Sequence, residues 1–66
     1  MELYINGSPR ADLSVESVGA LLRVLGLARD GVAVAVNGAV VPRSQHDQSP
    51  LRAGDRVEII QAVGGG

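Results

Sequence analysis

The sequence predicts a single α+β domain in which a mixed sheet of four to five strands packs against one helix. Three observations lead to this prediction. Apolar residues alternate with the period of a strand near both ends of the chain, a stretch between them has the period of a helix, and 66 residues leave room for one small core. A sheet with one apolar face needs a second layer to cover it, and the helix can supply that layer.

The first predicted element is a strand over residues 1–6, in which every second residue is apolar. Asn6-Gly7 then closes it with the turn chemistry of a tight hairpin. Residues 8–13 are expected to return as a second strand. Pro9 has no backbone N–H to donate, which places this second strand at an edge of the sheet or makes it short.

The apolar spacing becomes helical after Ser14, which is the expected N-cap. The residues that share one stripe of this helix are Val15, Val18, Leu21, Leu22 and Leu25. Gly26 stands where a left-handed C-cap would end the helix. Gly19 inside the helix costs about 1 kcal/mol relative to Ala, and we expect it to permit a close approach to the sheet.

A second hairpin is predicted from residues 32–36, where Val alternates with Ala, through Asn37-Gly38 to a return strand at residues 39–41. Residues 43–50 are polar, and we expect an irregular loop there with one short helical turn. Residues 56–63 have the alternation of a final strand.

The element order is therefore hairpin, helix, hairpin, loop, strand. When the last strand lies beside the first and parallel to it, the connection between the two halves is a right-handed crossover, and the result is the β-grasp arrangement. We expect residues 1–63 to form this domain. Residues 64–66 are expected to form a flexible glycine tail that, fully extended, reaches roughly 10 Å beyond the last strand.

Composition excludes several classes of function. The formal charge is −1, and Tyr4 is the only aromatic residue, so the chain has the means neither to neutralise phosphates nor to stack on bases. The absence of Cys excludes thiol nucleophiles and disulfides. There is no signal-like leader and no apolar stretch near the ~20 residues of a membrane span. We expect a cytoplasmic protein that contacts neither nucleic acid nor membrane.

His46 is the only histidine and lies in a polar segment without a second strong metal ligand. We therefore expect a solvated loop residue at this position and no metal site.

The alternation of the strands also predicts a docking face. When the valines of residues 32–36 face the helix, the opposite side of the sheet is apolar and adjoins the glycine tail. The residues expected on that side are Tyr4, Ala33, Ala35, Ile60 and Ala62. Exposed apolar surfaces of this kind mark contacts with partner proteins.

Four segments together resemble the ThiS-type sulfur carriers of thiamine biosynthesis, which belong to the ubiquitin-like β-grasp family. They are residues 31–38 (Gly-Val-Ala-Val-Ala-Val-Asn-Gly), 41–44 (Val-Pro-Arg-Ser), 54–60 (Gly-Asp-Arg-Val-Glu-Ile-Ile) and 63–66 (Val-Gly-Gly-Gly). The resemblance extends over nearly the whole chain.

This resemblance implies a carrier that is acted on by enzymes and is not itself one. In the family, an adenylating enzyme of the ubiquitin-activating type uses ATP to activate the C-terminal carboxylate, here that of Gly66. A sulfur donor then converts it to a thiocarboxylate, and a thiazole synthase accepts the sulfur. Gly64 and Gly65 would thread into the partner's site. The chain itself has no phosphate-binding loop, so we expect ATP to bind the partner and no cofactor to bind the carrier.

Three alternatives remain open on the residues. One is a related carrier that serves molybdopterin or another sulfur-containing product. A second is a ubiquitin-like modifier that becomes attached to target proteins; since the chain has no Lys, side-chain-linked chains of this protein itself are excluded. A third is an interaction module of the same fold with an inert tail.

Overall fold

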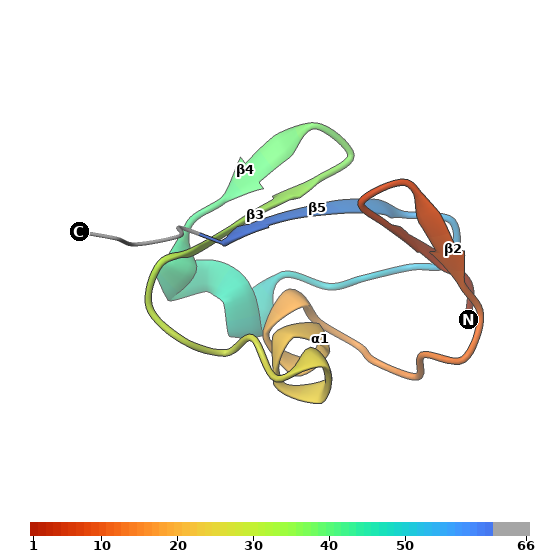
Figure 1. Cartoon of the computed structure of the whole chain (residues 1–66), viewed down its shortest axis with the longest axis horizontal. Helices are drawn as coiled ribbons and strands as arrows, with labels where there is room; N and C mark the ends of the chain where they lie inside the picture. Colours follow the sequence, from red (N-terminus) through yellow and green to blue (C-terminus); the bar gives the residue numbers. More distant parts are fainter. Residues whose placement is uncertain (62–66) are drawn as a thin grey trace.

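A five-stranded mixed sheet with the order β2-β1-β5-β3-β4 forms one layer of the structure, a computed structural model that describes residues 1–61. The strands are β1 (Leu3–Ile5), β2 (Ser8–Arg10), β3 (Val32–Val36), β4 (Ala39–Val41) and β5 (Arg56–Gln61). Helix α1 (Val18–Leu25) and the 3₁₀ helix η1 (Arg43–Gln48) lie together on one side of this sheet (Figure 1). The predicted α+β class and β-grasp arrangement are confirmed.

Strand β5 occupies the centre of the sheet. It runs parallel to β1, with Ile5 opposite Val57, and antiparallel to β3, with Val34 opposite Ile59. The parallel pairing of the first and last strands is the one that the element order predicted. It makes the long connection between them a crossover that carries α1 across one side of the sheet.

Both predicted hairpin turns are present, but β2 is shorter than expected. Asn6 and Asn37 have φ of 51° each, in the left-handed region that a two-residue hairpin turn requires. Strand β2 ends at Arg10 instead of continuing to residue 13. Beyond it the chain leaves the sheet, and Arg10 forms an ion pair with Asp12 at 3.0 Å. As predicted, Pro9 lies in an edge strand.

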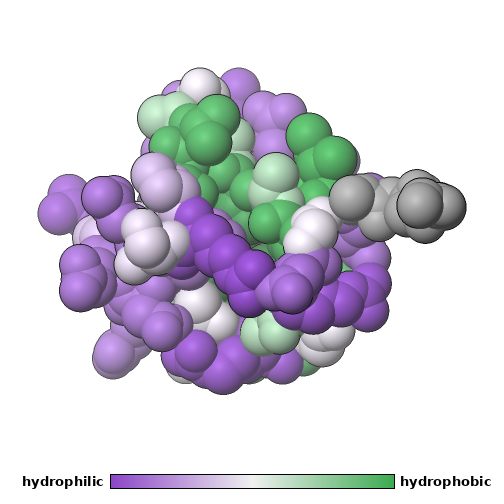
Figure 2. All heavy atoms as spheres, turned by 90° about the vertical axis from the view of Figure 1, so that its left-hand side faces the viewer, coloured by the Kyte–Doolittle hydropathy of each residue, from purple (hydrophilic) through white to green (hydrophobic). Residues whose placement is uncertain are grey.

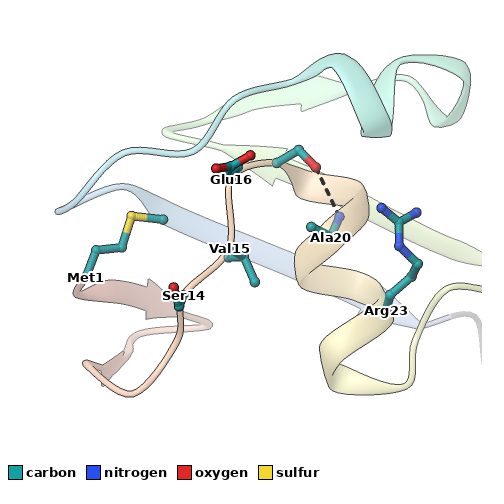
Figure 3. A pocket seen from close by; sticks show the side chains of 7 residues that line it. Met1, Ser14, Val15, Glu16, Ala20 and Arg23 are labelled. Atoms are coloured by element: carbon teal, nitrogen blue, oxygen red, sulfur yellow. Dashed lines mark hydrogen bonds between the residues drawn. The ribbon is translucent and has the colours of Figure 1, made fainter.

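Helix α1 begins later than predicted. Its N-cap is Ser17, whose side-chain oxygen accepts a hydrogen bond of 3.1 Å from the backbone N–H of Ala20, drawn as the dashed line in Figure 3. Ser14, the expected cap, lies in the extended connection before the helix (Figure 3). In the described part of the chain, neither helix is long and apolar enough to cross a membrane.

The late start of the helix has a tertiary cause. The backbone N–H of Val18 donates to the carbonyl of Ser49, and the N–H of Leu51 donates to the carbonyl of Glu16, both at 3.0 Å. These two bonds hold the chain before α1 in an extended bridge with the segment before β5. A helical turn there would withdraw the carbonyl and N–H groups that this bridge uses.

The two helix glycines have different outcomes. Gly26 is the C-cap, with φ of 75°, as predicted. Gly19 does permit a close approach, but its neighbour is not the sheet. A Cβ built at Gly19 would collide with the side chain of Asp47 in η1, so the missing side chain allows η1 to pack against α1.

The core lies between the sheet and the helical layer. It contains Leu3, Leu13, Val15, Val18, Leu21, Leu22, Val32, Val34, Leu51, Val57 and Ile59. Burial of a Leu, Ile or Val side chain contributes about 1.5–3 kcal/mol. The three central strands supply the most deeply buried sheet residues, with Leu3 of β1 fully buried, Val57 of β5 1% exposed and Val34 of β3 2% exposed.

His46 is buried, at 9% exposure, and the prediction of a solvated loop residue is wrong. Its ring nitrogen Nε2 lies 3.2 Å from the carbonyl oxygen of Val41, within hydrogen-bond distance. The ring is buried where η1 packs against α1, a contact between segments far apart in the sequence. His46 therefore links the 3₁₀ helix to the end of β4.

Candidate functional site

The side of the sheet opposite the helices carries an apolar surface. Side chains alternate along β3 and β5, so that Val34 and Ile59 are buried in the core while Ala33, Ala35 and Ile60 face outward. Ala33 lies directly opposite Ile60 in the sheet register. These three residues lie where the sequence placed them, and their part in docking stays a prediction.

Val40 belongs to the same surface and was missed in the sequence. It lies opposite Ala35 in β4, and its side chain is 77% exposed, compared with 66% for Ile60. The signal was present, because a two-residue turn at Asn37-Gly38 fixes the register and sets Val40 beside Ala35. We name Ala33, Ala35, Val40 and Ile60 the outer patch.

The outer patch is part of a wider division of the surface. Figure 2 shows hydrophobic surface gathered in the upper part of the view, on the side of the sheet, with hydrophilic surface below it, on the side of the helices. An apolar surface at one side of a small domain is suited to contact with another protein.

Tyr4 faces the same side of the sheet but does not touch the outer patch. Tyr4 pairs with Arg56 in the sheet register. Arg56 precedes Ile60 by four residues, so the Cα atoms of these two residues lie about 13 Å apart along β5. The side chain of Glu58 projects between them on the same face. The Tyr4 hydroxyl donates to Glu2 Oε1 at 3.3 Å, and Tyr4, Arg56 and Glu58 line a hollow of about 650 Å³.

The remaining predicted site residues lie outside the described part of the chain. They are Ala62, Gly64, Gly65 and Gly66. The last described residue of β5 is Gln61, which pairs with Val32 at the start of β3. Gln61, one residue after Ile60, is therefore the last described residue of the strand that carries the outer patch toward the C-terminus.

Two asparagine side chains fix the position of β5. Asn6 Oδ1 accepts from the backbone N–H of Ile59 at 2.8 Å, and Asn6 Nδ2 donates to the Ile59 carbonyl at 3.2 Å. Asn37 Oδ1 accepts from the N–H of Arg56 at 2.9 Å, and its amide donates to Asp55. The strand that leads to the C-terminal residues is thus held from both of its neighbours.

Arg10 and Asp12, an ion pair with shifted pKa values, lie far from the outer patch. The pKa of Asp12 is lowered from its ordinary value because its carboxylate accepts hydrogen bonds of 3.0 Å from the guanidinium of Arg10. The pair is exposed and lies just beyond β2, at the other edge of the sheet from β4. Nothing in this pair resembles a catalytic acid or base.

A second hollow, of about 490 Å³, lies beside the start of α1 (Figure 3). Its ionisable side chains are Glu16 and Arg23, which come from the connection and from the helix. The Ser17 side chain in its lining already caps the helix by accepting from Ala20. Within residues 1–61, no three His, Cys, Asp or Glu side chains are grouped as a metal site would need.

The fold and the outer patch together define a ubiquitin-like β-grasp domain. The model of the ThiS family matches residues 3–66, nearly the entire sequence. The chain belongs to the ThiS family.

The relatives of this chain include thiazole synthases and a sulfur carrier protein. The chain is 41% identical to a thiazole synthase of Paramagnetospirillum magneticum and 35% identical to one of Magnetococcus marinus, in each case over all 66 residues. It spans only 20% of the length of those two proteins. It is also 30% identical to the sulfur carrier protein ThiS of Escherichia coli, over the full length of both chains.

Solved structures agree with these matches. The chain is similar to the crystal structure of the thiamine biosynthesis protein ThiS from Geobacter metallireducens, with a TM-score of 0.82 and 36% identity over 100% of both chains. The solution structure of a thiamine biosynthesis protein from the same organism gives the same TM-score and identity and is covered over 88% of its length.

Proposed function

We propose that this chain is a sulfur carrier for thiazole formation in thiamine biosynthesis, a protein cosubstrate on which other enzymes act. The observation that carries the proposal is the match of the ThiS family over residues 3–66. The name of the full-length relative from Escherichia coli, a sulfur carrier protein, supports it. The similarity to two solved structures of thiamine biosynthesis proteins favours the thiamine pathway over the molybdopterin alternative.

The reactive atom of the proposed carrier is the carboxyl carbon of Gly66. A carboxylate is a poor electrophile, so an adenylating enzyme first joins it to the α-phosphate of ATP and releases pyrophosphate. Hydrosulfide from the sulfur donor then attacks the carbonyl carbon, the bond to the phosphate breaks and AMP leaves, and loss of the S–H proton gives the thiocarboxylate. The carrier contributes no acid, base or nucleophile of its own, in keeping with the scattered ionisable side chains of residues 1–61.

A thiazole synthase is the proposed acceptor of the sulfur. Two relatives with this name contain a region similar to the whole chain within a protein about five times as long. Such an arrangement keeps a carrier region close to the rest of the protein, where its effective concentration is high. This supports a thiazole synthase as the partner in the last step.

The outer patch is the proposed docking surface for the adenylating enzyme. Ordering Gly64, Gly65 and Gly66 in the enzyme's site costs about 1–2 kcal/mol of backbone entropy per residue, or roughly 3–6 kcal/mol in total. Burial of Ile60 and Val40, each contributing about 1.5–3 kcal/mol, offsets a cost of that size. Their position beside the start of the C-terminal segment allows both events to occur in one complex.

Intact mass measures the proposed reaction directly. Incubation with ATP, a sulfur source and the adenylating enzyme is expected to shift the mass of the chain by the exchange of one oxygen for sulfur. A chain that lacks Gly66 is the control and should accept no sulfur. Attachment to a lysine of another protein would instead support the modifier, and unchanged function without Gly66 would support the interaction module.

A matched pair of substitutions tests the docking surface. Ile60 and Val24 are aliphatic side chains of nearly equal exposure, 66% and 63%, on β5 and α1 respectively. Ile60→Gln is expected to lower kcat/KM for adenylation about tenfold, equivalent to ~1.4 kcal/mol, and Val24→Gln to leave it within about twofold. Equal kinetics for the two variants would remove the outer patch from the proposal.

A further inference from the structure

Three arginines from three segments line one small hollow on the helical side of the molecule. Arg23 lies in α1, Arg29 in the connection after it, and Arg43 at the start of η1. The hollow has a volume of about 180 Å³, and the side chains of His46 and Asp47 also line it. We name it the arginine groove.

The arginine groove has more positive than negative charge. Arg23 Nη1 lies 2.9 Å from Asp47 Oδ1, and Arg43 forms an ion pair with Asp30. Arg29 donates to the neutral side chain of Gln61. Three guanidinium groups and two carboxylates leave a charge of +1 among these described residues, on a chain whose formal charge is −1.

The ion pairs of the groove can exchange partners. The side chains of Arg23 and Asp47 are 60% and 71% exposed, and those of Arg43 and Asp30 are 67% and 86% exposed. Exposed pairs of this kind contribute at most about 1 kcal/mol. Each guanidinium also has five N–H donors in a fixed fork that fits a carboxylate or phosphate. An arriving carboxylate therefore meets unused donors at little cost.

The groove and the outer patch flank the base of the C-terminal segment from opposite sides. Gln61 is the last described residue of β5, and its bond to Arg29 joins it to the groove on the helical side. Ile60, one residue earlier, faces outward in the patch. A protein that receives the segment after Gln61 therefore meets an apolar surface on one side and a basic one on the other.

We propose that the arginine groove binds acidic side chains of the adenylating enzyme, so that the enzyme holds the carrier from both sides of β5. This inference rests on the proposed function. The phosphates of the nucleotide are not the occupant. When the five residues after Gln61 are extended in the enzyme's site, as the proposed function requires, they span about 17 Å, so the adenylate on Gly66 lies far from Arg29. Carboxylates on the enzyme surface have no such restriction.

The test compares Arg29→Glu with Arg52→Glu, which change the net charge equally. Arg52 is exposed in the connection before β5, and its side chain forms no ion pair in residues 1–61. Arg29→Glu is expected to lower the association rate with the adenylating enzyme about tenfold at low ionic strength, and the loss should vanish near 1 M salt, where the Debye length is about 3 Å. Arg52→Glu should stay within about twofold. Equal rates for the two variants would overturn the proposal.

An NMR titration of the ¹⁵N-labelled chain tests whether the arginine groove binds carboxylates, independently of sulfur transfer. A hexaglutamate peptide is expected to shift the amide signals of Arg29, Arg43 and their neighbours saturably, and Arg29→Gln should abolish this response. Absence of a saturable response at the groove, or a response to inorganic pyrophosphate alone, would overturn the inference. A chain that binds the peptide but accepts no sulfur contradicts only the proposed function.

Discussion

The β1–β2 and β3–β4 hairpins turn through the same dipeptide, Asn-Gly, with nearly the same backbone angles. The asparagines both have φ of 51°, and the glycines have φ of 86° and 85°. Each hairpin has one strand beside β5 and one at an edge of the sheet. The same Asn-Gly turn thus connects the strands of two hairpins that have different surroundings.

Both hairpins supply core residues, Leu3 from the first and Val32 and Val34 from the second, but only the second also supplies residues of the outer patch. In the first, Leu3 is fully buried, Asn6 is bonded to the backbone in the middle of β5, and Pro9 protects the edge. In the second, Val40 is exposed, and the Asn37 side chain reaches only the start of β5. Turn residues determine that a hairpin forms, and the side chains of its strands determine what it does.

The largest expected contrast lies between a buried side chain of the first hairpin and an exposed side chain of the second. Leu3→Ala should reduce the free energy of unfolding by about 2–5 kcal/mol, because it leaves a cavity in the core. Val40→Ala should change it by no more than about 0.5 kcal/mol, since that side chain is already exposed. Urea denaturation measures both. A loss for Val40→Ala that approaches the loss for Leu3→Ala would show that the exposed side chain of Val40 also stabilises the fold.

The second largest contrast is expected between the two turn asparagines, in the free energy of unfolding that each side chain contributes. Asn6→Gly and Asn37→Gly both keep the left-handed backbone accessible, so the comparison isolates the side-chain bonds. Loss of the Asn6 amide leaves the N–H and carbonyl of Ile59 unpaired in a partly buried place, at a cost of about 1–3 kcal/mol. Asn37→Gly affects exposed groups and should cost less. A larger loss for Asn37→Gly would contradict this account of β5.

Outward-facing residues of the two edge strands, β4 and β2, are expected to differ in their effect on adenylation by the partner enzyme. Val40→Gln is expected to lower kcat/KM for adenylation severalfold, up to about tenfold, without a change in the free energy of unfolding. Pro9→Gln alters the outward position opposite Tyr4 in the first hairpin and should leave the rate within about twofold. An equal effect at Pro9 would extend the docking surface across the sheet to Tyr4.

The smallest expected effect concerns the edge of the first hairpin. Arg10→Gln should raise the pKa of Asp12 toward its ordinary value, because the hydrogen bonds from the guanidinium are lost. The lowered pKa means that this pair stabilises the native chain above the ordinary pKa of Asp and ceases to do so as the pH falls through the lowered one. The carboxyl resonance of Asp12 in an NMR pH titration measures the shift. An unchanged pKa in the variant would assign the effect to another group.

Local chemistry was sufficient to predict most of the fold. Alternation identified β1, β3 and β5 and their buried sides, and the Asn-Gly dipeptides alone predicted both turns and the return strand β4. The start of α1 was placed three residues early, at Ser14. Both serines satisfy the local preference for an N-cap, and the choice of Ser17 depends on backbone bonds to Ser49 and Leu51, which no local pattern reveals.

The candidate site was predictable only in part, for the same reason. Ala33, Ala35 and Ile60 follow from strand alternation, but the separation of Tyr4 from the outer patch depends on how β1 and β5 are aligned. The burial of His46 depends on the packing of η1 against α1 at Gly19, and the arginine groove joins three segments that approach one another only in the folded chain. Periodic patterns in the sequence do not reveal contacts between residues that are far apart along the chain.

The central place of β5 determines how the domain responds when its C-terminal end is pulled. Tension along this strand loads the parallel ladder with β1 and the antiparallel ladder with β3 in shear, so that many hydrogen bonds must break together. An edge strand would instead peel away one bond at a time. Drawing the end of the chain into a partner's site, as the proposed function requires, would therefore leave the body of the domain intact.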